Sequence, residues 1–224
     1  MKKLVMISLL FVLAIQTYAQ QTKFGIYIEP APTWYSTVSR DVTNSGAMMG
    51  FSGGLMIDYF FQDNYAFSSG IGIGMHKGKL SYDEQFTMNV YDEVLQIDPC
   101  DVKYQINYIH IPLGLKLKTN EIGYFTYFAN VGLSTYFNHS AKASTSLPVT
   151  FGDGETRHLE DDNIKEEVEF ASLGYHFGAG LEYGLGGNTS LIFGVTFHNI
   201  FTDVTAESTK VTPRILSIRA GIMF

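Results

Sequence analysis

The chain has 224 residues, of which 46% are hydrophobic and 14% aromatic, and its formal net charge is -7. This length suits a single domain, and no Pro-, Ser- or charge-rich linker divides it. The acidic balance argues against nucleic acid as a partner. The single cysteine, Cys100, excludes an internal disulfide.

The first twenty residues have the pattern of a secretory signal peptide. Lys2 and Lys3 precede an apolar run over residues 4–15, and Thr17-Tyr18-Ala19 forms a small-x-small cleavage site. The run is shorter than the roughly 18 to 20 residues that a spanning helix needs. We therefore predict a signal peptide over residues 1–19 and export through the Sec pathway. Removal of the two lysines takes the net charge from -7 to -9.

After the signal peptide, nearly every apolar stretch alternates with a period of two, as in a β-strand with two unlike faces. In the first stretch Phe24, Ile26 and Ile28 share one face, while Tyr27 and Glu29 share the other. Eight such strands are predicted, near residues 24–35, 51–61, 65–76, 108–117, 125–137, 172–182, 191–198 and 216–224.

Two of these strands carry unusual residues. In GIGIGMHKG, residues 70–78, the glycines recur at every second position, which places them on one face of a strand. A phosphate-binding loop would instead lead into a helix. Pro112 stands in the middle of its strand, where it should remove a ladder hydrogen bond, so we expect a local bulge there.

The predicted connections alternate in length. Three short ones lie near residues 62–64, 119–123 and 184–188, and four long ones near residues 37–50, 77–103, 138–167 and 199–213. Membrane barrels with an even number of antiparallel strands have short periplasmic turns, long extracellular loops and both termini in the periplasm.

The two faces distinguish this barrel from a soluble one such as a lipocalin, which keeps its apolar side chains inside. Here the strand charges lie with the glycines and histidines, and the apolar face carries none. An Arg or Lys facing the lipid midplane would cost roughly 2 to 4 kcal/mol. We predict an all-β fold over residues 20–224, an eight-stranded antiparallel transmembrane β-barrel of the outer-membrane type.

Five charged side chains face the predicted lumen: Glu29, Asp58, Lys116, Glu182 and Arg219. An eight-stranded barrel is just wide enough for side chains to fill it. We therefore expect these charges to pair and plug the lumen as a structural cluster. A narrow pore or proton path is the alternative, because perturbed charges are also a mark of function.

Four histidines also face inward: His76, His110, His176 and His198. If residue 183 pairs with residue 189 across the last short turn, His198 lies opposite Gly174 and diagonal to His176. A zinc site requires three or four converging ligands. We expect instead ordinary lumen residues bonded to water and tyrosines, with no metal and no cofactor.

The loop DGETRHLEDDNIKEEVE, residues 153–169, holds eight acidic residues. It lacks the ligand spacing of an EF-hand, so we predict a solvated extracellular loop that bridges to lipopolysaccharide through divalent cations at most.

A surface lipid hydrolase would need a Ser, a His and an acid at one strand end. His139 and Ser140 are the candidates, and their geometry is not fixed by the sequence, so we predict a protein that is not an enzyme.

Four stretches resemble the PorT or "porin family protein" group of outer-membrane β-barrel domains in Gram-negative cell envelopes. They are YIHIPLGLKLK (108–118), FGAGLEYGL (177–185), FGVTFHNIF (193–201) and RAGIMF (219–224). The resemblance implies insertion by the barrel assembly machinery, which would recognise the C-terminal Phe224. It also implies contact with outer-membrane lipid and lipopolysaccharide. The extracellular loops would meet a protein partner in a surface or envelope-structural role, or the chain would be an accessory of secretion or surface assembly.

Overall fold

The computed structural model describes residues 22–37, 40–91, 93–151, 154–203 and 211–224, so the predicted signal peptide lies outside the described residues. Within these ranges no helix has the length and apolarity to cross a membrane. The elements are β1 (Thr22–Thr37), β2 (Val42–Gln62), β3 (Tyr65–Tyr82), β4 (Phe86–Val90), β5 (Glu93–Ile97), β6 (Asp101–Lys118), β7 (Phe125–Thr145), β8 (Val149–Thr150), β9 (Thr156–Arg157), β10 (Asp162–Asn163), η2 (Lys165–Glu167), β11 (Ala171–Gly186), β12 (Thr189–Ile200) and β13 (Val211–Met223).

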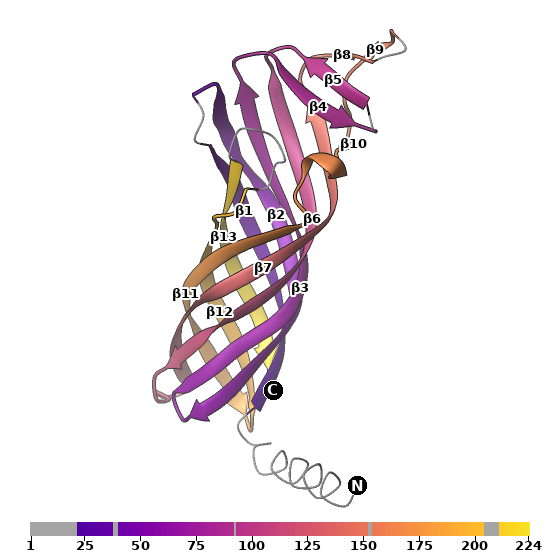
Figure 1. The fold of residues 1–224 in the computed structure, drawn as a ribbon. Helices are drawn as coiled ribbons and strands as arrows, with labels where there is room; N and C mark the ends of the chain where they lie inside the picture. Colours follow the sequence, from indigo (N-terminus) through magenta and orange to yellow (C-terminus); the bar gives the residue numbers. More distant parts are fainter. Residues whose placement is uncertain (1–21, 38–39, 92, 152–153, 204–210) are drawn as a thin grey trace, which may run out of the picture.

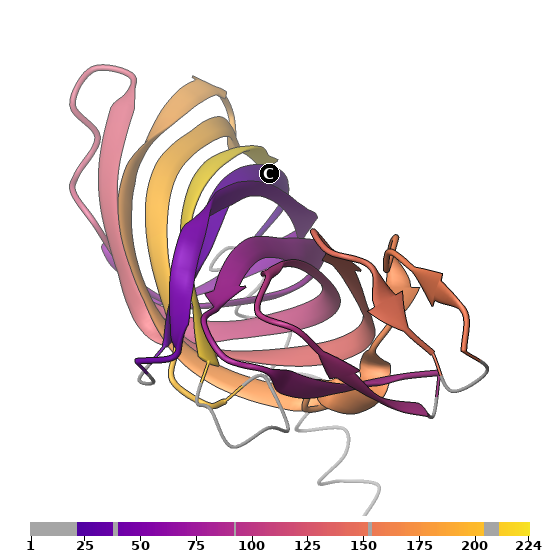
Figure 2. The same cartoon turned by 90° about the horizontal axis from the view of Figure 1, so that it is seen from above.

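Eight of the described strands form a closed antiparallel ring, in the order β1, β2, β3, β6, β7, β11, β12, β13 (Figures 1 and 2). β13 returns to β1, where Ile26 pairs with Ile222 and Trp34 pairs with Arg214. The predicted eight-stranded barrel is confirmed. We call the end with the three short connections the turn end, and the opposite end the loop end.

The predicted outward and inward faces are also confirmed. Ile71 and Ile73 on β3 are 50% and 66% exposed, whereas Ala66 and His76 on its other face are buried. Exposed large apolar side chains recur on all eight strands, and we call them the apolar belt. A belt of this kind replaces the exposed polar surface that a soluble barrel would need.

The strands are longer than predicted. β2 and β7 each have 21 residues, about twice the roughly 9 to 11 that a tilted strand needs to cross a membrane. The connection predicted over residues 37–50 is mostly strand, because β1 runs to Thr37 and β2 begins at Val42. Polar residues such as Asn44 and Ser45 interrupt the apolar alternation from which strands were predicted, because a strand outside the lipid needs no apolar face.

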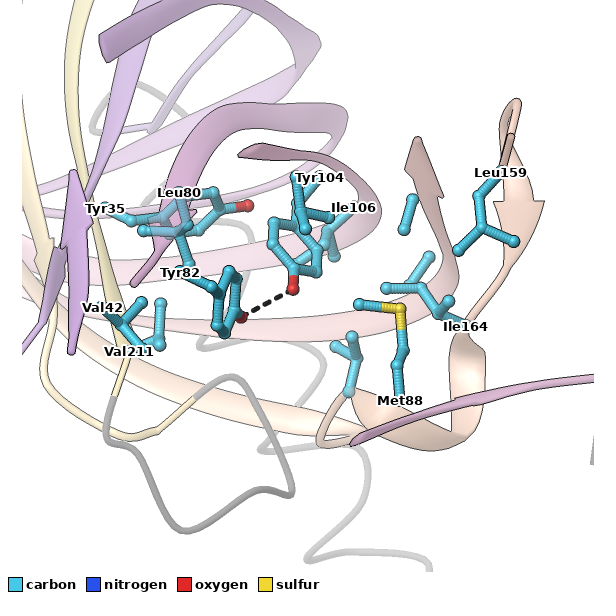
Figure 3. Packing of buried hydrophobic residues seen from close by; sticks show 14 of the residues in the cluster. Tyr35, Val42, Leu80, Tyr82, Met88, Tyr104, Ile106, Leu159, Ile164 and Val211 are labelled. Atoms are coloured by element: carbon cyan, nitrogen blue, oxygen red, sulfur yellow. Dashed lines mark hydrogen bonds between the residues drawn. The ribbon is translucent and has the colours of Figure 1, made fainter. Parts of the chain in front are cut away.

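Above the belt, β2, β3, β6 and β7 continue upward and support a folded cap, made of the β4–β5 hairpin, the β8–β9 hairpin, β10 and η2 (Figure 1). The cap shares one apolar core with the inward faces of the long strands. Figure 3 shows Met88, Leu159 and Ile164 of the cap gathered in this core with Leu80 and Tyr104 of the wall. The connections predicted as loops near 77–103 and 138–167 are therefore largely structured.

Pro112 does not produce the expected bulge. Pairing of β3 with β6 stops between Ser69↔Leu113 and Gly72↔His110, then resumes in the same register. The ladder opens over two residue pairs instead, and the hydroxyl of Ser69 donates to the carbonyl of Pro112 at 3.0 Å. The missing N–H is thus tolerated without an added residue.

The inward glycines of residues 70–78 make room for rings from neighbouring strands. A Cβ on Gly78 would overlap the ring of Tyr35, which is 2% exposed. A Cβ on Gly72 would meet both Tyr27 and His110. These glycines are required by packing, because closed cores accept little added volume.

The substitution Gly78→Ala is expected to lower the free energy of unfolding by about 1 to 3 kcal/mol, because the buried Tyr35 ring must move. Gly184→Ala is the matched control, since a Cβ there meets its nearest neighbours at an ordinary 3.7 Å. Urea unfolding in detergent compares the stability of the two variants. The folded fraction is measured on a gel, where the folded barrel migrates differently from the barrel unfolded by heat. Equal stability of both variants would contradict the packing role of Gly78.

Candidate functional site in the barrel interior

The five charges predicted to face the lumen lie in the interior in two groups, with Asp58, Lys116 and Glu182 nearest the turn end and Glu29 midway along β1. Lys116 Nζ lies 2.6 Å from Asp58 Oδ2 and 2.7 Å from Glu182 Oε1. In the second group, Arg219 Nε donates to Glu29 Oε1 at 2.5 Å. We call these residues and Lys118 the charge cluster.

Lys118 was not predicted to face the lumen, although it stands two residues after Lys116 and therefore on the same face of β6. Its Nζ lies 2.5 Å from Glu182 Oε2. The signal was present, but a lysine at a strand end is more often directed to water.

Lys116 joins walls of the barrel that are not adjacent. Asp58 stands on β2 and Glu182 on β11, while Lys116 stands on β6, so its side chain links three strands across the interior. Its ammonium also lies 4.7 Å from the centroid of the Phe128 ring. Asp58, Lys116 and Glu182 are all less than 5% exposed. A buried charge in this setting depends on its partners, because unpaired it would carry the full desolvation cost.

A cavity of about 610 Å³ opens at the turn end of the barrel. Lys118 and Glu182 of the charge cluster line it, together with Lys23 and with Glu121 of the β6–β7 turn. The buried cluster therefore lies beside this mouth.

The four inward histidines lie among tyrosines, farther from the turn end than Asp58, Lys116 and Glu182. Tyr27 Oη and His110 Nε2 are 3.3 Å apart, and Tyr136 Oη and His198 Nδ1 are 3.0 Å apart. His76 stacks on the ring of Tyr108, with centroids 3.9 Å apart. His176 Nδ1 lies 2.8 Å from the hydroxyl of Ser134. We call this the histidine–tyrosine layer.

The register predicted for two of these histidines is wrong. His198 lies directly opposite His176, not opposite Gly174, and their ring centroids are 5.7 Å apart. Thr189 pairs with Gly186 rather than with residue 183, and a bulge between Gly184 and Gly186 then shifts the pairing by one residue, so that the final register differs from the predicted one by two residues. Gly186 and Gly187 have positive φ, which allows a tighter turn than the one assumed.

Within the described residues, no group of three or more His, Cys, Asp or Glu side chains is placed to hold a metal ion. Three of the four histidines bond to tyrosine or serine instead. Tyr27, Tyr108 and Tyr136 are thus part of the layer, and of these only Tyr27 was assigned to the inward face above.

The acidic loop is not simply solvated. Asp153 lies outside the described residues, but Asp162 is 5% exposed and pairs with Arg157 at 3.3 Å. Glu167 Oε1 accepts a hydrogen bond from the backbone N–H of Asn89 in β4, at 2.5 Å. These contacts make the loop a part of the cap.

His139 and Ser140, the candidates for a hydrolase, stand at a bulge of β7. Asn107 pairs with Ser140 and Tyr108 with Asn138, which leaves His139 as the added residue. Across the described part of the chain, no side-chain hydrogen bond joins either residue to a carboxylate. An activated serine needs a base and an acid within hydrogen-bond reach.

A family model described as outer membrane protein β-barrel domain matches residues 8–205. Among solved structures, Neisserial surface protein A is 18% identical, with a TM-score of 0.46, and the match covers 89% of this chain and 95% of that chain. Outer membrane protein OprG of Pseudomonas aeruginosa is 14% identical, with a TM-score of 0.43 and coverage of 90% and 95%. The attachment invasion locus protein Ail of Yersinia pestis is 14% identical, with a TM-score of 0.39 and coverage of 91% and 99%. No curated protein matches the chain.

Lys116→Met is expected to lower the free energy of unfolding by about 3 to 5 kcal/mol, because it leaves the buried Asp58 carboxylate without its cation. Adding Asp58→Asn should restore part of the loss, since the amide carries no charge to desolvate. Urea unfolding of the folded barrel in detergent measures both variants. A double variant less stable than the single one would refute the assignment of Lys116 to charge compensation.

Proposed function

Because the chain belongs to the outer membrane protein β-barrel domain family, we propose that it is a non-enzymatic outer-membrane barrel whose cap serves recognition at the cell surface. In this proposal the turn end faces the periplasm and the loop end faces outward, as in other barrels of even strand number. The Sec pathway and the barrel assembly machinery deliver it there, and the outward-facing partner is a protein.

The folded cap carries this proposal. Surfaces that are ordered before binding lose less conformational freedom when a partner docks. Leu95 and Ile97 of the β4–β5 hairpin are 4% and 2% exposed, so the hairpin is held by its own packing. A purely structural barrel would need only short loops to close its strands.

The tip of this hairpin has the features of a contact surface. Tyr91 is 58% exposed and has a φ of 52°, and Val94 is 72% exposed. A tyrosine in the left-handed region is uncommon, and such strain gathers at functional positions. Exposed aromatic side chains are also frequent anchors of protein interfaces.

The filled interior supports a role other than transport. The charge cluster and the histidine–tyrosine layer lie in contact, with Arg219 over the ring of Tyr27, inside a ring of strands that is just wide enough for side chains. The narrow pore is the alternative, and conductance steps in planar bilayers would favour it. The hydrolase alternative would require Ser140 to find a base, and unchanged lipid turnover in Ser140→Ala would remove it.

The orientation predicts which introduced cysteines react on intact cells. Glu84→Cys and His158→Cys in the cap should label with a membrane-impermeant maleimide, whereas Asp63→Cys and Asn188→Cys at the turn end should label only after lysis. All four positions are exposed. Background from Cys100 should be low, because this thiol is buried and burial raises its pKa. The reverse labelling pattern would contradict the orientation.

Surface recognition is tested by a photo-crosslinking residue placed at Tyr91 in growing cells, with Asn188 as the matched exposed position at the turn end. We expect a discrete protein adduct from position 91 alone. Adducts confined to position 188 would support the alternative, a PorT-like accessory of secretion or surface assembly. Absence of any adduct at position 91 would contradict the recognition role.

A further inference from the structure

Four lysines lie together on the outward face of β3, β6 and β7, just above the apolar belt. Lys77 of β3 pairs with Gln105 of β6, and Gln105 pairs with Lys142 of β7. One step higher, Lys79 pairs with Lys103. We call Lys77, Lys79, Lys103 and Lys142 the lysine patch.

The pairing registers give the height of the patch above the belt. The row Ile73, Ile109 and Phe137 belongs to the apolar face, and the row of Met75, Asn107 and Ser140 follows it. Lys77 stands four residues beyond Ile73, the last row of the belt on these strands, about 13 Å along a strand. At a tilt of roughly 40° this distance is about 10 Å along the membrane normal.

The headgroup region adds about 5 to 7 Å to each side of the hydrocarbon core. The backbone of the lower row therefore lies just beyond the headgroups, and the ammonium groups reach the lipid phosphates when the flexible lysine stems extend back toward the membrane. The cap does not cover them, because it packs on the opposite, inward face of the same strands, against Leu80, Val102 and Ala143.

The charge of the patch is only partly compensated. Lys79 Nζ lies 2.8 Å from Asp101 Oδ2. No ion pair links Lys77, Lys103 or Lys142 to another described residue. On the β10 side Asp161 accepts a hydrogen bond from Ser144, the residue opposite Lys103, at 3.3 Å. Four cations thus stand beside two recorded carboxylates, in a chain whose net charge is -7.

Like charges on adjacent strands repel one another, so their placement in register needs an opposing charge. We propose that the lysine patch binds the phosphate groups of a phosphorylated glycolipid whose acyl chains lie against the apolar belt below it. Ammonium groups bind phosphate as point charges, and a flexible lysine stem reaches a headgroup readily. The identity of the outer leaflet as the source rests on the orientation under the proposed function.

The test uses the full barrel folded in detergent, with diphosphoryl lipid A and the same lipid after removal of its phosphates as probes. Native mass spectrometry counts the lipid molecules retained. Lys77→Gln/Lys142→Gln should reduce retention of diphosphoryl lipid A by about thirtyfold, since each lysine near an anionic lipid surface contributes about fivefold in affinity. Lys77→Arg/Lys142→Arg should retain it.

Arg40→Gln/Arg214→Gln is the matched control, because it removes the same charge from the β1–β2 turn and from β13. Higher salt should weaken retention by the wild-type barrel. Equal retention of the dephosphorylated lipid, or an equal loss in the control, would overturn the proposal. Micelles have no sidedness, so this outcome is independent of the orientation that cysteine labelling decides.

Discussion

An eight-stranded barrel is just wide enough for side chains to meet across its interior, and this width governs the rest of the molecule. An inward aromatic side chain on one strand fits only where the facing strands carry small residues. Gly72 and Gly78 leave the space that Tyr27 and Tyr35 occupy. The alternating glycines near residue 70, which superficially suggest a nucleotide loop, are thus the counterpart of the inward tyrosines.

The same narrow interior explains the order of its contents from one end to the other. Asp58, Lys116 and Glu182 lie near the turn end, where each meets an opposite charge within about 3 Å. Histidines and tyrosines follow beside the Glu29–Arg219 pair, and the apolar core shared with the cap closes the loop end.

Alternation with a period of two was sufficient to predict the eight strands, their faces and the inward charges, because lipid and lumen impose opposite demands on neighbouring residues. The strand extensions and the cap escaped prediction for the same reason. Above the belt the outer face meets water, so residues 42–48 need no apolar alternation. The five-residue strands β4 and β5 are too short for periodicity to distinguish them from loop.

The site was predicted less completely than the fold. Five residues of the charge cluster were predicted to face the lumen from the alternation along each strand alone. The distances between their side chains depend on registers across several strands. The tight turn that pairs Gly186 with Thr189, together with a bulge between Gly184 and Gly186, changed which residue faces His198. Pairing of Lys77 with Gln105 and of Gln105 with Lys142 likewise becomes visible only when three strands are aligned, although they lie 28 to 65 residues apart in sequence.

Strands β2, β3, β6 and β7 pass from the belt into the wall of the cap without a hinge in the described residues, and this has a mechanical consequence. A partner that pulls on the cap loads long hydrogen-bond ladders in shear, and many bonds then resist together. The force passes directly to the membrane-embedded wall, so the cap keeps a fixed angle to the surface under load. A partner bound to the cap therefore transmits tension to the envelope through continuous strands, whereas a partner bound to a flexible loop would first extend the loop.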